Sequence, residues 1–461
     1  MSIERARMAG SSRTALSATT ILIGGLVFVA GYVTVLMWAM TRSNYDVTGA
    51  MLVGPLLLAG LLPLISRQAA RESDPAIFSI LVFALLLRFV GAVARYFVAF
   101  TVYEGVADAS VYHDAGVKIS AAFRAGDFTT GLESLTGTNF LRFATGVLYT
   151  VIGPTKLGGF FFFAALAFVG SFFFYRAFTI AIPDGYRKTY ARLIFFLPSL
   201  VFWPSSIGKE ALMTFTLGLC ALAAARILTG SMRRGIFLLA IGLWLAGVLR
   251  PHMAGVVIVS VGAAYLLKPS PASLRQMAPV AKVAGIAILS VIAFVAVTRA
   301  ESFLHEADIS TDAGVSGALQ GVTSRTNEGG SGFDPYHIWS PAEAPLAAAT
   351  VLFRPLPTDA HNVQAQLAAV EGVFLLFFSV WRLPRLLGAV RRMRHLPYIA
   401  YAATFVGLSI VGFSGVANFG LLVRERTQFL PLYVALLCIP SLRHMPAETV
   451  RTHDAQMSTV R

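Results

Sequence analysis

The sequence predicts an all-α protein, a polytopic transmembrane bundle of about twelve helices with amphipathic helices in its first extracytoplasmic loop. Two observations carry this prediction. Of the 461 residues, 56% are hydrophobic and only 13% are charged, about half of the roughly 25% that soluble domains carry. The apolar residues also gather in long stretches, many of them near the 20 or so residues that cross a bilayer.

The stretches that fit a membrane span can be placed along the chain in order. They are 20–40, 48–65, 76–100, 155–178, 190–203, 209–229, 236–249, 252–268, 280–298, 363–382, 397–415 and 427–441. The segments 190–203 and 236–249 are short for a bilayer, so they predict local thinning, tilt or partial re-entry.

Lys and Arg are concentrated in one set of loops between these spans. Short basic loops lie on the cytoplasmic side of membrane proteins, so both chain ends are expected in the cytoplasm. The opposite, extracytoplasmic set comprises the segments 41–47, 101–154, 204–208, 250–252, 299–362 and 416–426. The net charge of +14 is explained by the basic loops, so no nucleic-acid partner is expected.

The same map divides the chain into regions. A basic tail at 1–19 precedes a transmembrane bundle at 20–298, which includes the outer loop 101–154. An outer loop at 299–362, a C-terminal bundle at 363–441 and a tail at 442–461 follow. Within the second outer loop, residues 306–334 are rich in Gly, Ser, Thr and Asn, a composition typical of a mobile flap. The two cysteines, Cys220 and Cys438, fall inside apolar segments without metal or disulfide spacing.

The first outer loop is predicted to contain a short amphipathic helix at 109–124, ended by Gly126. Its apolar stripe would consist of Val111, Ala115, Ile119 and Phe123. Asp108 precedes this helix and has two compatible interpretations, an N-cap or a catalytic carboxylate at the membrane surface. Asp114 is the second candidate for the carboxylate. His113 beside it is interpreted as part of a solvated polar face, because no spacing fixes a third metal ligand.

Lys209 and Glu210 begin another predicted span, with Ser205 or Ser206 as its cap. The start of a helix attracts phosphate, which favours a functional role for Lys209 over that of an interfacial anchor. Inside the membrane, Arg88 and Glu371 are expected to form a structural ion pair, since either charge alone is costly in hydrocarbon.

Cations recur on the predicted outer side, where the charge rule disfavours them. One such residue is readily an interface anchor, but several together indicate a site for a lipid phosphate or pyrophosphate, because Arg binds phosphate oxygens in pairs. The phosphate-binding candidates are Lys209, Arg250, Arg354, Arg424 and Arg426. The candidates for contacts with the rest of the substrate are Tyr112, His113, Glu210, His252, Asp359 and His361.

The acidic segment ADASVYHDAG in the first outer loop, the amphipathic helix and the many spans with cytoplasmic termini resemble the GT-C glycosyltransferases. The strings FWPSSIGKEAL, LFRPLPTDAHNVQAQLAAVEG and NFGLLVRERTQFLP are similar to uncharacterised bacterial membrane proteins associated with cell-surface polysaccharide assembly. The resemblance implies an enzyme of the bacterial inner membrane. It would move a sugar from a polyprenyl-phosphate donor to a glycan or lipid acceptor. The carboxylate of Asp108, or of Asp114, would act as base or as ligand of a divalent cation such as Mg²⁺ or Mn²⁺.

Two further interpretations stay open. A polymerase or ligase of undecaprenyl-pyrophosphate glycans would use the same outer cations, with His337 or His361 as the catalytic residue. A flippase or transporter of lipid-linked sugars should carry polar residues in both leaflets and repeats between its halves, whereas this sequence concentrates its polar residues on one side.

Overall fold

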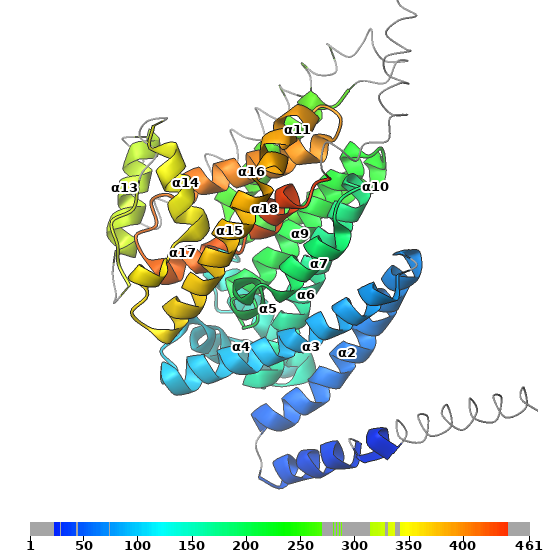
Figure 1. Ribbon diagram of the computed structural model, residues 1–461. Coiled ribbons are helices and arrows are strands. Elements are labelled where there is room, and N and C mark those ends of the chain that lie inside the picture. The colour runs from blue at the N-terminus through cyan, green and yellow to red at the C-terminus, as the bar shows by residue number, and fades with distance from the viewer. Residues whose placement is uncertain are drawn as a thin grey trace, which may run out of the picture.

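The computed structural model describes residues 23–27, 29–42, 45–72, 74–269, 314–327, 331–336 and 342–440, with single positions between 280 and 287. In these residues the regular elements are helices, joined by one isolated bridge between Gly332 and Asn418 (Figure 1). The predicted tails at 1–19 and 442–461 lie outside the described residues, and so does almost all of the predicted span 280–298.

The described residues form a helical bundle with 7 helices long and apolar enough to cross a membrane. They are Ile23–Thr41, α2 (Tyr45–Glu72), α3 (Pro75–Phe97, continued by the π-helix η1, Val98–Val102), α6 (Lys156–Ala181), α9 (Lys209–Leu228), α10 (Met232–Leu249) and α15 (Val363–Arg392). The shorter helices among the spans are α7 (Arg187–Phe196), α8 (Pro198–Phe202), α11 (Pro251–Leu267), α16 (Pro397–Phe413) and α18 (Leu430–Leu437). The remaining helices, in the predicted outer loops, are α4 (Asp108–Arg124), α5 (Gly137–Ile152), α13 (Gly314–Thr326), α14 (Ala344–Phe353), η3 (Pro357–Asp359) and α17 (Phe419–Arg426).

Helices α6 and α9 form the interior of the bundle. In the most apolar 18-residue stretch of each helix, 67% of the α6 residues and 89% of the α9 residues are buried. The corresponding shares are 22% for α10 and 28% for α15. Small residues let the two interior helices approach closely, as they do in membrane proteins generally. A Cβ atom on Gly218 would lie only 2.2 Å from the carbonyl oxygen of Gly170. The outer helices therefore face lipid, and α6 with α9 supports the rest.

The predicted span 190–203 is broken into α7 and α8. Pro198 occupies the first turn of α8, and a proline there cannot continue the hydrogen bonds of the preceding helix. The backbone N–H of Ser199 is thereby free to donate to the Glu371 carboxylate at 2.7 Å. The predicted Arg88–Glu371 ion pair is wrong, because Arg88 donates to Ser171 at 2.7 Å instead.

Loops that the sequence assigns to the same side contact one another. On the predicted outer side, the Tyr103 hydroxyl donates to Gln364 at 3.0 Å and the Lys156 N–H to Asp46 at 2.6 Å. On the predicted cytoplasmic side, Lys188 pairs with Asp74 at 2.8 Å. Each of these contacts joins segments that the sequence places on the same side of the membrane.

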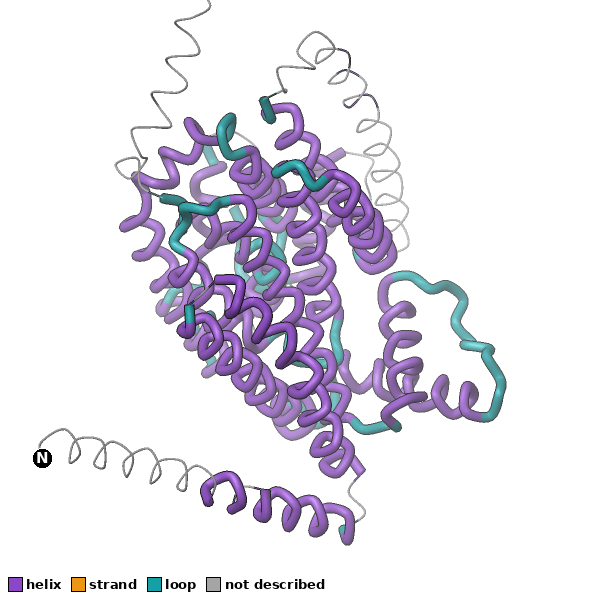
Figure 2. The backbone as a smooth tube through the Cα atoms, turned by 90° about the vertical axis from the view of Figure 1, so that its right-hand side faces the viewer, coloured by secondary structure: helices purple, strands orange, loops and turns teal. Residues whose placement is uncertain are grey.

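The first outer loop forms a helical hairpin, α4 and α5, that stands out from the side of the bundle (Figure 2). The predicted helix is confirmed, and Gly126 follows its end with a φ of 84°. The predicted stripe is wrong in part, because Val111 is 47% exposed whereas Ile119 is buried. Gly116 shares the buried face with Ile119, and this face packs on α5 where Gly146 leaves room for the isoleucine.

The described part of 306–334 is folded onto the C-terminal helices, so interpreting it as a mobile flap was wrong there. Helix α13 covers Gly314–Thr326. The Thr326 hydroxyl accepts a hydrogen bond from the Ala417 N–H at 2.8 Å, and the Phe333 ring stacks on Phe419 with centroids 4.1 Å apart. These contacts tie the second outer loop to the segment just before α17.

Candidate functional site

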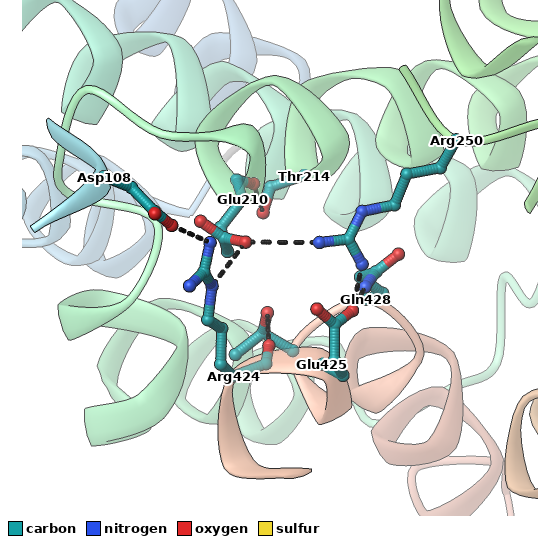
Figure 3. A network of polar contacts seen from close by, with 8 residues as sticks. Asp108, Glu210, Thr214, Arg250, Arg424, Glu425 and Gln428 are labelled. Atoms are coloured by element: carbon teal, nitrogen blue, oxygen red, sulfur yellow. Dashed lines mark hydrogen bonds and ion pairs between the residues drawn. The ribbon is translucent and has the colours of Figure 1, made fainter. Parts of the chain in front are cut away.

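A chain of alternating charges joins four segments that are far apart in the sequence (Figure 3). Its first link is Arg424 on α17. The Arg424 Nε lies 2.6 Å from a Glu210 carboxylate oxygen at the start of α9. The Arg424 Nη2 lies 3.2 Å from an Asp108 oxygen at the start of α4. One guanidinium therefore connects the first outer loop to the bundle.

The chain continues from Glu210 to the turn between α10 and α11. Arg250 in this turn lies 3.4 Å from Glu210 and also forms an ion pair with Glu425. We call Asp108, Glu210, Arg250, Arg424 and Glu425 the polar cluster. Its three carboxylates and two guanidiniums sum to a net charge of −1, so its arginines are already neutralised within the cluster.

Burial differs sharply across the polar cluster. The Glu210 and Arg250 side chains are only 5% and 12% exposed, whereas that of Asp108 is 62% exposed. The Glu210 carboxylate raises the pKa of Arg424 against the opposing effect of burial, so Arg424 stays charged. Asp108 is thus the carboxylate of the polar cluster that solvent can reach, whereas Glu210 and Arg250 are largely buried.

A polar cavity of about 180 Å³ opens beside the cluster. Asp108, Glu210 and Arg424 line it, together with Arg95, Ser206 and Gly208. A second cavity of about 430 Å³ lies between α8, α15 and α17, with mainly apolar walls that include Phe202 and Leu367. Tyr103, Trp203 and Arg424 line both cavities, so the two are neighbours, one polar and one apolar.

Arg95 is a site residue that the sequence analysis missed. Its guanidinium lies 4.9 Å from the Phe202 ring and 5.0 Å from the Trp203 ring, and it lines the polar cavity. It forms no hydrogen bond or ion pair with any residue in the described part of the chain. The sequence did contain a signal for Arg95, because it is an arginine near the outer end of the predicted span 76–100. Arginines at the outer boundary were selected as candidates in the other outer segments.

Lys209 begins α9, directly after the cavity-lining Gly208. Gly208 is the N-cap of α9, and the Ser205 hydroxyl donates to the Val201 carbonyl oxygen at 2.6 Å. The prediction of a serine cap is therefore wrong, because Ser205 is still part of the preceding turn. Within the described ranges, the Lys209 ammonium has no ion-pair partner.

The cap interpretation of Asp108 is also wrong. Ala107 is the N-cap of α4 and Asp108 its first helical residue, and no side chain caps the helix. The Asp108 carboxylate is directed to Arg424 instead. The other candidate carboxylate, Asp114, is exposed on α4 and lines neither cavity.

Two of the predicted phosphate-binding arginines line neither cavity and have structural partners. Arg354 makes two hydrogen bonds of 2.9 Å to Asp359, which lower the pKa of the Asp359 carboxyl. Arg426 is fully buried and donates to the carbonyl oxygens of Leu352 and Arg354, at 2.8 and 3.2 Å. Arg426 thereby links α14 to α17, so Arg354 and Arg426 stand apart from Arg250 and Arg424.

The remaining candidates for substrate contacts include both buried and exposed side chains. Tyr112 and His113 are 3% and 8% exposed, and the His113 Nδ1 lies 2.8 Å from the Tyr149 hydroxyl. The solvated interpretation of His113 is therefore wrong, since α5 covers that face of α4. His252 follows Arg250 at the start of α11, and His361 is exposed ahead of α15. His337 lies outside the described residues.

No group of three or more His, Cys, Asp or Glu side chains is placed to hold a metal ion among the residues described above. Both cysteines are buried thiols. The acids of the polar cluster are paired with arginines.

The fold and the site together define a multi-pass helical membrane protein with a polar cluster beside an apolar cavity. Comparison with protein-family models, with curated proteins and with solved structures finds no match to this chain.

Proposed function

We propose that this protein is a membrane glycosyltransferase of the GT-C type. It moves a sugar from a polyprenyl-phosphate donor to a glycan or lipid acceptor at the extracytoplasmic face of the bacterial inner membrane. The observation that carries the proposal is the pair of neighbouring cavities, which share Tyr103, Trp203 and Arg424. A donor with a hydrocarbon chain, a phosphate and a sugar matches an apolar cavity that adjoins a polar one.

Arg95 and Lys209 are the cations that bind the donor phosphate in this proposal. Neither has an anionic partner among the described side chains, whereas Arg250 and Arg424 are neutralised by Glu210, Glu425 and Asp108. Arg95 lines the polar cavity, and Lys209 lies in the chain between Gly208 and Glu210, which also line it. Adding these two cations to the polar cluster changes the local charge from −1 to +1, which favours an anion. Stacking on Phe202 and Trp203 holds the Arg95 guanidinium in place, so little entropy is lost when phosphate binds.

Asp108 is the general base. The acceptor hydroxyl oxygen forms a bond to the anomeric carbon, the bond from that carbon to the phosphate oxygen breaks, and polyprenyl phosphate leaves. The hydroxyl proton passes to the Asp108 carboxylate, while Arg95 and Lys209 stabilise the charge on the departing phosphate. The exposure of Asp108 beside the polar cavity supports this role.

The membrane arrangement belongs to the same proposal. Besides the seven long helices, the segments α7–α8, α11, 280–298, α16 and α18 cross the membrane, giving twelve spans with both termini in the cytoplasm. In intact cells, an impermeant thiol reagent should label Lys118→Cys on α4 and leave Arg391→Cys on α15 unlabelled. Both positions are exposed and both native cysteines are buried. The opposite pattern would reverse the orientation.

The test of function is Asp108→Asn, compared with Asp114→Asn on the same helix. Membranes containing the chain are supplied with undecaprenyl-phosphate-linked hexoses, and sugar transfer is measured. Because Asp108 is 62% exposed and Arg424 keeps its contact with Glu210, loss of the Asp108–Arg424 contact should change the stability by about 1 kcal/mol or less. Loss of a general base should lower transfer by about 100-fold or more, while Asp114→Asn should be near normal.

The outcomes distinguish the alternatives. Near-normal transfer by Asp108→Asn with loss in Asp114→Asn would move the base to Asp114. Movement of lipid-linked sugar across vesicles without transfer in the unaltered chain would favour a transporter. Binding of undecaprenyl phosphate is a separate readout: Arg95→Gln should weaken it by about 10-fold or more, because a hydrogen bond to a charged group contributes about 1.5–3 kcal/mol.

A further inference from the structure

A second group of cations lies on α15, near the end remote from the polar cluster. Arg382, Arg385 and Arg392 follow one another at intervals of three and seven residues, so they lie on one face of the helix. Arg382 and Arg392 are only 7% and 5% exposed, while Arg385 is half-buried. Arg392 donates to the Pro440 carbonyl oxygen, which places this face against the chain just after α18.

These arginines keep several enclosed N–H groups without hydrogen-bond partners in the described part of the protein. They are Nε and Nη1 of Arg382, Nη1 of Arg385, and Nε and Nη2 of Arg392. Of the carboxylates on the neighbouring segments, Asp74 pairs with Lys188 and Glu72 accepts from Tyr175. The exposed Asp184 forms no ion pair with these arginines. A buried guanidinium without a counter-charge is costly, and the described part of the chain supplies no anion to this group.

Aromatic rings hold two of the guanidiniums side by side. Arg382 lies 4.2 Å from the Trp381 ring and 5.2 Å from the Tyr186 ring, and Arg385 lies 4.2 Å from the same Tyr186 ring. Stacking of this kind occupies the flat faces of a guanidinium. The N–H groups at its edge stay directed in the plane, where they suit the oxygens of a phosphate.

The surface next to these arginines is apolar. Val380, Trp381, Leu387 and Val390 are 61–69% exposed on the same stretch of α15, and this stretch belongs to a helix long and apolar enough to cross a membrane. A buried cationic group beside an exposed apolar surface matches a molecule with an anionic head and hydrocarbon chains. The basic loops gather at this end of the bundle, where anionic lipid headgroups would meet them.

We propose that Arg382, Arg385 and Arg392, with Tyr186, bind the phosphate of an anionic phospholipid whose chains lie on the apolar surface of α15. The half-buried Arg385 gives the group its opening to the lipid. Helix α15 has 30 residues and is therefore about 45 Å long. Its first residues line the cavity next to Arg424, whereas these arginines lie near its last residues, so this site is separate from the polar cluster. The proposal does not depend on the proposed glycosyltransferase activity.

The experiment compares lipid binding by the purified chain in detergent, supplied with phosphatidylglycerol or with phosphatidylcholine of the same acyl chains. Bound lipid is counted by native mass spectrometry, and the thermal midpoint is measured in parallel. Phosphatidylglycerol should bind and raise the midpoint, and phosphatidylcholine should do neither. Arg385→Gln should weaken binding by about 10-fold or more, because phosphate hydrogen bonds to a charged group are lost.

The matched control is the double variant Arg391→Gln/Arg394→Gln, which removes exposed charges close by in the chain and should bind like the unaltered protein. Arg385→Lys, which keeps the charge without the planar fork, should bind phosphatidylglycerol more weakly than the unaltered protein and more tightly than Arg385→Gln. Equal binding of both lipids would overturn the proposal, and so would an equal loss in the control. Full stabilisation by inorganic phosphate alone would show that the ligand is a soluble anion and not a lipid.

Discussion

Glu210 holds the polar cluster together, and its replacement by Gln is the sharpest test of the structure. The carboxylate contacts Arg424 at 2.6 Å and Arg250 at 3.4 Å, and its side chain is 5% exposed. Glutamine keeps the shape of the side chain and removes the charge. Two buried guanidiniums would then share only Glu425 and the exposed Asp108.

The expected loss follows from these distances. At an effective dielectric constant of about 20, each contact contributes about 5–6 kcal/mol of Coulomb energy, most of which offsets the cost of burying the charges. Removing one partner of a buried pair destabilises a protein by about 3–5 kcal/mol, because an uncompensated charge remains. Glu210→Gln should therefore lower the free energy of unfolding by about this amount.

The free energy of unfolding can be measured by titration with a denaturing detergent, followed by circular dichroism. Glu133→Gln, which removes an exposed carboxylate from the first outer loop, is the matched control and should change stability by about 0.5 kcal/mol or less. The double variant Glu210→Gln/Arg424→Gln should lose less than the sum of the two single variants. If Glu210→Gln matches the control, the polar cluster does not hold the segments together as described.

Two further predictions concern packing and pH. Gly170→Ala should destabilise the protein by about 1–3 kcal/mol through overpacking, because its Cβ would lie 2.4 Å from the Thr214 carbonyl oxygen. Gly60→Ala, with nothing within 4 Å, should be neutral or stabilising in thermal melts. Burial lowers the pKa of His113, so stability should be full above the unfolded pKa of about 6.5 and fall as the pH decreases below it. His113→Gln should flatten this profile and the exposed His361→Gln should not, whereas equal profiles would count against burial as the cause.

The sequence by itself determined the all-α fold class and most helix positions. Hydrophobic length was sufficient, because it acts along the chain without reference to tertiary contacts. The grouping of the loops by Lys and Arg stays a prediction. The α4 helix was predicted within one residue of its start. Its buried face was not, because the position of α5 decides which side of α4 is covered.

The same distinction applies to the site. Asp108, Glu210, Arg250 and Arg424 could be singled out from the sequence as polar residues at one predicted boundary. Only the tertiary structure decided that they form one paired network, that Arg354 and Arg426 have structural partners elsewhere, and that Arg95 has no ion-pair partner in the described part of the chain. The physical reason is that a charge binds a ligand only when no nearby side chain neutralises it. Which side chains are near depends on how α3, α4, α9 and α17 pack together.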